Sequence, residues 1–175
     1  MPIERPPLLR LGGEEAFDAY QAEFDRLYRS GPVFDVLGRL VEFPRSACRH
    51  VCFKAPEADP YGRLPRDAWS QERAERIPWI LEALSNPGTE VRPHLSDPAK
   101  QVYLPAVDGE GCPPEWFFVV VARVGPNSLE FVTAFRVPYD YWFDWRKGGP
   151  RIYPEPKQPA KPKKGRRHKS KGQGA

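Results

Sequence analysis

One histidine of the sequence has basic neighbours on both sides. His50 lies in ACRHVCFK (47–54), next to Arg49 and four residues before Lys54. Cleavage of RNA without a metal needs a base that takes a proton from a 2′-hydroxyl and an acid that protonates the departing 5′-oxygen, and histidine titrates where both are possible. A lone histidine is also often a hydrogen-bonded structural residue. We predict His50 as a catalytic candidate and Arg49 and Lys54 as RNA-binding candidates.

Two arginines are spaced to be neighbours on a helix surface. Arg73 and Arg76 are three residues apart in SQERAERI. Guanidinium groups that reach a phosphate stabilise the negative charge of the transition state in its cleavage. The alternative is a solvent-facing surface of ion pairs, because Glu72 and Arg76 have a favourable i,i+4 spacing. We predict Arg73 and Arg76 as catalytic candidates that stabilise a phosphate.

A single hydroxyl interrupts an otherwise apolar strand pattern in LEFVTAFRV, residues 129–137. The alternation predicts that one face of this strand carries Leu129, Phe131, Thr133, Phe135 and Val137. Thr133 could direct its hydroxyl to a scissile phosphate, or it could be an ordinary strand threonine whose hydroxyl bonds to the backbone. We predict Thr133 as the fourth catalytic candidate.

The cysteines suggest a zinc site that strand geometry disfavours. Cys48 and Cys52 flank His50, and Cys112 is distant in the chain. If 47–54 is a strand, alternate residues are about 6.6 Å apart, which is awkward for three ligands of one tetrahedral ion. A Cys–His nucleophile pair is disfavoured because adjacent strand residues point to opposite faces. We expect no metal and no cofactor.

The end of the chain differs from the rest in its charge. The chain has 27 basic and 23 acidic residues, and eight of the basic ones lie in 157–171, which leaves 19 for the rest. The body is therefore slightly acidic. Residues 154–175 have too little apolar surface to fold, so we predict a disordered tail that binds RNA through its charge. The RNA-binding candidates there are Lys161, Lys163, Lys164, Arg166, Arg167 and Lys169.

Apolar residues recur with helical spacing in the first half of the chain. We predict helices over 14–30, 33–43 and 69–85, with a short strand over 47–54 and an irregular loop that follows it. Pro78 lies inside the third helix. Because its ring removes a backbone hydrogen-bond donor, we expect a kink there or a restart with Pro78 in the first turn.

Four strands are predicted in the second half of the chain. They cover 89–95, 99–105, 115–124 and 129–137, and the last two are separated by a turn of hairpin length, GPNS. Helices followed by a meander of strands are typical of an α+β fold. We predict N-terminal helices packed on a roughly four-stranded antiparallel sheet, in a single domain over residues 1–153.

Two segments of this pattern resemble a known nuclease family. The helix RAERIPWILEALSNP, with Arg73, Arg76, Trp79 and Pro87, and the strand FVTAF, with Thr133, are similar to the phage-associated branch of the barnase, EndoU, colicin and RelE-like (BECR) nuclease superfamily. The resemblance runs over about 46–137, roughly half of the chain. It implies helices beside a four-stranded antiparallel sheet and a metal-independent RNA-cleaving site.

The resemblance also implies roles for individual residues. His50 would act as acid or base, Arg73 or Arg76 as the phosphate-stabilising cation, and Thr133 as a hydroxyl aimed at the phosphate. We therefore expect a metal-independent ribonuclease of phage or toxin type that cleaves RNA by attack of the 2′-hydroxyl.

Two alternatives from other classes stay open. One is a non-catalytic RNA-binding or ribosome-associated module, in which the tail and the aromatic segment 139–145 bind RNA. The other is a virion-associated component whose tail contacts packaged nucleic acid. Because the sequence has no apolar run of about 20 residues and few cysteines, we expect a cytoplasmic protein without a membrane partner. Its expected partners are RNA and, for a toxin, an immunity or antitoxin protein.

Overall fold

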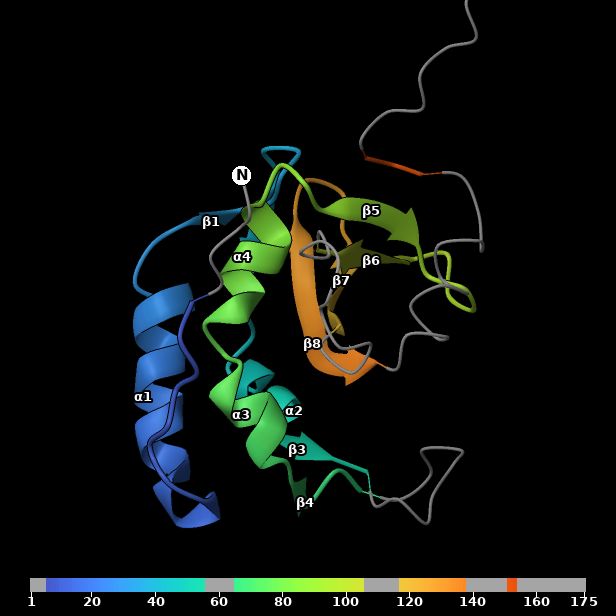
Figure 1. Ribbon diagram of the computed structural model, residues 1–175. Coiled ribbons are helices and arrows are strands. Elements are labelled where there is room, and N and C mark those ends of the chain that lie inside the picture. The colour runs from blue at the N-terminus through green and yellow to red at the C-terminus, as the bar shows by residue number, and fades with distance from the viewer. Residues whose placement is uncertain (1–5, 56–64, 106–116, 138–150, 154–175) are drawn as a thin grey trace, which may run out of the picture.

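Six strands form one mixed sheet, with the helices gathered beside it (Figure 1). The computed structural model describes residues 6–55, 65–105, 117–137 and 151–153. In spatial order, the strands are β1 (Val33–Phe34), β2 (Leu40–Glu42), β8 (Leu129–Val137), β7 (Phe117–Val124), β6 (Lys100–Leu104) and β5 (Glu90–Pro93). The α+β class predicted from the sequence is confirmed.

The predicted meander is present, and the sheet continues beyond it. β5, β6, β7 and β8 pair as antiparallel neighbours, and the turn between the last two is closed by a hydrogen bond from the Gly125 amide to the Ser128 carbonyl (2.8 Å). β2 then adds to β8 in parallel, with Val41 opposite Leu129. The prediction of a four-stranded, purely antiparallel sheet is therefore wrong in strand number and in direction.

The two additional strands come from a segment predicted as a helix. Residues 33–43 form the hairpin β1–β2, in which Val33 pairs with Val41. Gly38 has a positive φ of 75°, which is easily adopted only by glycine. The Asp35 carboxylate accepts hydrogen bonds from the amides of Leu37 (3.0 Å) and Arg39 (2.8 Å). The apolar residues have helical spacing, but these turn interactions decide the local structure.

Replacing Gly38 with alanine is expected to lower the free energy of unfolding by about 1 kcal/mol, because a Cβ disfavours the left-handed region. Open space surrounds the position of that Cβ, so the change tests backbone conformation alone. Gly31 is the matched control, since its site is equally open and its φ is not positive. Urea unfolding of both variants measures the difference. Equal stability of Gly38→Ala and Gly31→Ala would contradict the assigned turn.

Helices α1 and α4 contribute several of the large side chains of the main core. The helical elements are a 3-10 turn (Glu14–Ala16), α1 (Phe17–Tyr28), α2 (Ala47–Cys52), α3 (Gln71–Glu75) and α4 (Trp79–Ser85). Tyr20, Phe24 and Tyr28 of α1 and Ile80 and Leu84 of α4 are buried there. In the part of the chain that the structure describes, none of the helices is both long and apolar enough to cross a membrane.

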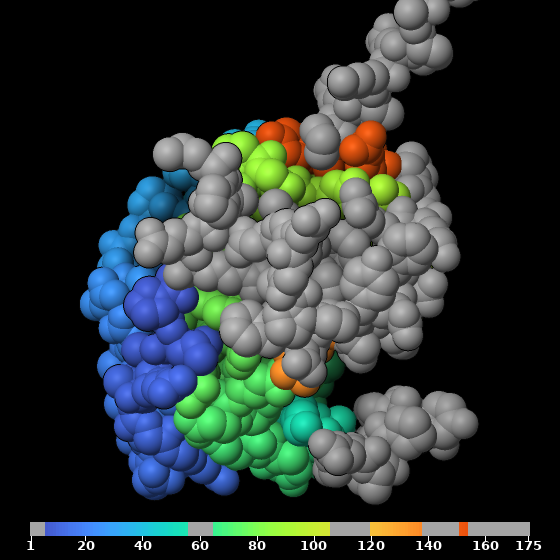
Figure 2. Space-filling view, viewed as in Figure 1, coloured from blue at the N-terminus to red at the C-terminus, as the bar shows by residue number. Residues whose placement is uncertain are grey.

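The predicted break at Pro78 is confirmed as a restart. Pro78 is the N-cap of α4 with a φ of −60°, so its missing amide costs no helical hydrogen bond. The segment before the first helix forms a hydrogen bond with each of the two short helices α3 and α4. The Leu9 amide donates to the Glu75 carbonyl of α3 (2.8 Å), and the Trp79 indole of α4 donates to the Pro6 carbonyl (2.7 Å). In the space-filling view this segment (blue) lies against the α3–α4 region (green) (Figure 2).

The segment 47–54, predicted as a strand, is mostly helical. Cys48, Val51 and Cys52 lie three and four residues apart and are fully buried, which is the spacing of one helix face. The strand is limited to β3 (Phe53–Lys54), which pairs with β4 (Ala68–Trp69) in a separate two-stranded ladder. Burial of the helix face outweighs the strand propensity of this short segment.

Candidate functional site

A recess forms where the sheet leaves one edge of β8 open. β2 pairs with β8 at Leu129 and Glu130, and among the described residues no strand pairs with the rest of that edge. α2 and α3 contact β8 there. The β3–β4 ladder brings Lys54 and Arg66 close together, because Lys54 pairs with Ala68, two residues after Arg66. Three separate parts of the chain therefore meet beside one strand.

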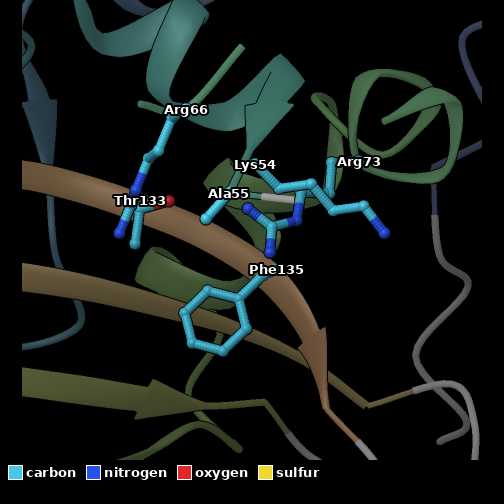
Figure 3. Close-up of a pocket in the computed structure, with 6 residues that line it drawn as sticks. All are labelled: Lys54, Ala55, Arg66, Arg73, Thr133 and Phe135. Atoms are coloured by element: carbon cyan, nitrogen blue, oxygen red, sulfur yellow. The ribbon is translucent and has the colours of Figure 1, made fainter. Parts of the chain in front are cut away.

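The recess is a pocket of about 240 Å³ whose wall carries three positive charges. The side chains come from β3 and its end, the residues before β4, α3 and β8 (Figure 3). Figure 3 shows the Arg73 guanidinium between Ala55 and Phe135, the Arg66 side chain reaching toward Thr133, and the Lys54 side chain extending away from Thr133. The lining residues are Lys54, Ala55, Arg66, Arg73, Thr133 and Phe135, none of which is acidic.

A β-bulge decides which way Thr133 points. Val121 pairs with Thr133 but the next residue, Ala122, pairs with Phe131, so Val132 is an extra residue in β8. Cross-strand partners share a face, and Val121 belongs to a second apolar cluster, whereas Ala122 and Phe131 belong to the main core. The prediction of one continuous row from Leu129 to Val137 is therefore wrong. The bulge places Thr133 in the row of Phe135, away from Phe131.

The Thr133 hydroxyl has a backbone partner. It donates to the His50 carbonyl of α2 at 3.3 Å, and Thr133 is 6% exposed. The ordinary structural role considered for this threonine is thus present, and the same residue also lines the pocket. The hydrogen bond fixes the end of α2 against β8. The hydroxyl can accept a further hydrogen bond or rotate toward a ligand, because a hydroxyl offers one donor and two acceptor positions.

The electrostatics of the pocket favour an anion. The pKa of Arg73 is lowered, first because the side chain is partly buried and then because Arg66 is nearby, while Glu72 acts in the opposite direction. The Glu72 carboxylate itself forms an ion pair with Arg136 (2.8 Å). Like charges in a partly desolvated site repel each other, and a bound anion relieves that repulsion.

The structure brings some of the predicted residues together and separates others. Arg73, Thr133 and Lys54 line the pocket. His50 contributes only its backbone carbonyl to a lining residue, and its side chain is exposed on α2. Arg49 is exposed on the same helix and lies over the Phe53 ring, 4.3 Å from its centre. His50 and Arg49 are therefore neighbours of the pocket and are not part of its wall.

The three-residue spacing predicted that Arg73 and Arg76 lie on the same face of one helix. In the structure they do not. α3 ends at Glu75, and Arg76 is its C-cap with a non-helical backbone. Its guanidinium donates to the Glu72 carbonyl (2.8 Å) and lies over the Trp79 ring (5.0 Å). The Arg73 guanidinium instead lies over the Phe135 ring at 5.4 Å. One turn of helix is too short to keep the two arginines in register.

Arg66 and Phe135 were not predicted as site residues. Arg66 lies in a segment rich in proline and glycine without periodicity, so only its charge could have indicated a role. Phe135 was assigned to the apolar row of β8, because a bulge leaves no reliable signal in the alternation of a short strand. The β3–β4 pairing positions Arg66, and the β-bulge positions Phe135. Both depend on how separate strands pair, which the local sequence does not show.

The cysteines of α2 are buried thiols. The sulfur atoms of Cys48 and Cys52 are 3.9 Å apart, on the side of the helix that faces the core. The pKa of the Cys48 thiol is raised by its hydrogen bond with Cys52 and by burial. A raised pKa disfavours the thiolate that a nucleophile or a zinc ligand requires. Among the described residues, no three metal-ligating side chains form a group that could hold a metal ion.

Several predicted RNA-binding residues lie outside the described residues. These are the aromatic segment 139–145 and the tail residues Lys161, Lys163, Lys164, Arg166, Arg167 and Lys169, and their roles stay predictions. In comparisons with known proteins, no family model, no curated protein and no solved structure matches the chain. A function therefore has to be inferred from the pocket.

Proposed function

We propose that the pocket binds a phosphodiester of RNA and that the chain is a metal-independent ribonuclease. The observation that carries the proposal is that Lys54, Arg66 and Arg73 line one recess and that none of its described lining residues is acidic. Guanidinium and ammonium groups are the usual phosphate ligands of proteins. The proposal agrees with the motif resemblance, which assigns RNA cleavage to this region of the chain.

The arrangement fits the charge that develops when a 2′-hydroxyl attacks the phosphate. The phosphorus becomes five-coordinate and its oxygens gain negative charge, which the guanidinium groups of Arg66 and Arg73 would stabilise by donating hydrogen bonds from positions that the fold already gives them. Thr133 can donate or accept a hydrogen bond at the same phosphate. We assign one of the two proton transfers, as acid or base, to His50, whose carbonyl accepts a hydrogen bond from Thr133 at 3.3 Å and whose side chain is exposed on α2; the other proton is exchanged with solvent.

A second candidate is RNA binding without cleavage. It is favoured by a specific observation, since the lining residues that the structure describes include neither an imidazole nor a carboxylate. A ribosome-associated or virion-associated module would need only the cations and the tail. The tail contributes to either function through counterion release at each neutralised phosphate.

Cleavage of a mixed RNA pool by the purified protein in excess EDTA tests the proposal. We expect products with 2′,3′-cyclic phosphate ends. Thr133→Val is expected to lower the rate by about tenfold or more, and His50→Ala by about 10²-fold, the low end for an acid or base. His94→Ala is the control for His50→Ala, because it removes a second described histidine that is not among the described residues of the pocket wall, and it should keep most of the rate.

The outcomes of this assay are distinct. Cleavage that is lost in His50→Ala but kept in His94→Ala supports the ribonuclease. Folded wild-type protein that binds the pool and leaves it intact supports the binding module. Protein that neither binds nor cleaves RNA contradicts both. Circular dichroism of each variant checks that it is folded.

We further propose a reducing compartment such as the cytoplasm as the site of action, because the two described cysteines are unpaired thiols. A ribonuclease of toxin type would there need an immunity or antitoxin protein that covers the pocket. An acidic surface is the expected chemistry of such a partner, since it would oppose the three cations of the wall.

A further inference from the structure

The two ends of the pocket differ in chemistry. Thr133 and Phe135 are alternate residues of β8, so their side chains leave the same face about 6.6 Å apart. Arg66 reaches toward the Thr133 end, and the Arg73 guanidinium lies over the Phe135 ring, 5.4 Å from its centre (Figure 3). The pocket thus has a polar cationic end and an end made of a ring and a guanidinium group.

A nucleotide has the same two parts in a similar spacing. Its phosphate is anionic, and its base is a flat ring system that stacks on aromatic side chains and on guanidinium planes. In a duplex the faces of the bases are covered by neighbouring base pairs, so a recessed ring cannot stack on them. The pocket volume of about 240 Å³ is below the usual range for drug-sized ligands, roughly 300–1,000 Å³, which leaves room for about one nucleotide.

We propose that the pocket binds one unpaired nucleotide of single-stranded RNA, with its phosphate held by Thr133, Arg66 and the edge of the Arg73 guanidinium, and with its base stacked on the Phe135 ring and the face of that guanidinium. This inference rests on the proposed function and adds the substrate class. It assigns Phe135 to base recognition, a role that neither charge nor hydrogen bonding predicts. It also explains why an aromatic side chain lies among cations in the pocket wall, half buried beside Arg73.

Competition binding with the full-length protein tests the inference. A fluorescent single-stranded RNA of about 12 nucleotides is displaced by the same unlabelled strand, by its duplex, and by polyphosphate, which carries charge but no base. Wild type is compared with Phe135→Leu and Phe135→Trp at one salt concentration. The tail is present in all three proteins, so its contribution cancels in the comparison.

The expected results separate stacking from charge. Wild type should bind the single strand more tightly than the duplex, and Phe135→Leu should weaken binding of the single strand about tenfold. Phe135→Trp should retain the affinity, because its ring also stacks. Polyphosphate should bind the three proteins equally. The inference is overturned if Phe135→Trp also has a lower affinity for single-stranded RNA. It is also overturned if Phe135→Leu lowers the affinity for polyphosphate as much as the affinity for RNA.

Failure of the inference and failure of the proposed function give different patterns. If Phe135→Leu binds single strands as well as wild type while Arg73→Gln weakens them, the pocket is a phosphate site without base stacking. If Arg73→Gln and Phe135→Leu both leave RNA binding unchanged, the pocket does not bind RNA, and both are wrong. Equal affinity of wild type for duplex and single strand also overturns the inference and leaves the phosphate site intact.

Discussion

Replacing Asp35 with alanine is expected to lower the free energy of unfolding by about 3 kcal/mol. The Asp35 carboxylate is fully buried and forms an ion pair with Arg39 (2.7 Å). It also accepts a hydrogen bond from the Tyr103 hydroxyl at 2.8 Å. Removal of one member of a buried ion pair typically costs about 3–5 kcal/mol, and the low end applies because the Arg39 side chain is partly exposed.

The same substitution also opens the turn of the β1–β2 hairpin. Without the carboxylate, the amides of Leu37 and Arg39 lose their hydrogen-bond acceptor. The Arg39 guanidinium keeps its hydrogen bonds to Gln101 (2.8 Å) and to the Tyr103 hydroxyl (3.1 Å). Burial is the main cause that raises the pKa of Tyr103, and Asp35 adds to it; burial remains in the variant, so the phenol stays protonated there as in wild type. The network joins the hairpin to β6, and its loss should affect the whole sheet.

Urea unfolding followed by tryptophan fluorescence measures the change, with Asp25→Ala as the matched control. Asp25 also pairs with an arginine four residues away, Arg29 at 2.9 Å, but it is 40% exposed. Exposed pairs contribute little, so Asp25→Ala should cost less than about 1 kcal/mol. If the two variants are equally stable, the buried network does not hold the hairpin to the sheet.

The second half of the fold could be predicted because its signals are local. An unbroken apolar run marks the strand before GPNS, alternation marks the strand after it, and GPNS itself marks the hairpin turn. In the first half, Pro78 marks the restart of the helix in the same local way. The hairpin at 33–43 could not be separated from a helix by periodicity, since its apolar residues fit both. Gly38 and the hydrogen bonds of Asp35 decide between them, and these interactions become visible only in three dimensions.

The candidate site could be predicted only in part, for a physical reason. Arg73 and Thr133 were found because each lies in an element with a clear pattern. Arg66 was missed because the β3–β4 pairing that positions it joins residues from two sides of an irregular segment. The bulge at Val132 changes which residues share a face with Thr133, and a short strand gives no signal of an inserted residue.

Replacing Arg66 and Arg73 together with glutamine is expected to weaken RNA binding by at least about 10²-fold. Each charge-assisted hydrogen bond contributes about 1.5–3 kcal/mol, so each single variant should lose about tenfold or more. The slope of log affinity against log salt should become shallower by about 0.7 for each lost phosphate contact. Titration of labelled single-stranded RNA at several salt concentrations measures both quantities.

Arg26→Gln is the matched control for this experiment. Arg26 lies on α1 and is well exposed, with an ion pair to Glu23, so its replacement removes the same charge at a distance from the pocket. Its affinity and salt slope should stay close to those of wild type. If Arg26→Gln loses as much affinity as Arg73→Gln, the effect comes from net charge, and the pocket has no specific role.

The stability of the same variants provides an independent test. The pKa of Arg73 is lowered by burial and by Arg66, which means that the fold disfavours the charged form of Arg73. Glutamine removes this unfavourable charge and also the contact with the Phe135 ring. We therefore expect the free energy of unfolding of Arg73→Gln to stay within about 1 kcal/mol of wild type.

The combination of the two single variants with the double variant shows whether both arginines act on one phosphate. Residues that contact the same ligand group give non-additive effects, so the loss in the double variant should be smaller than the product of the single losses. Multiplied losses would place Arg66 and Arg73 on different phosphates of the strand. If Arg66 and Arg73 bind a ligand, their variants should lose RNA affinity and keep their free energy of unfolding. If the two residues mainly stabilise the fold, the variants should lose both.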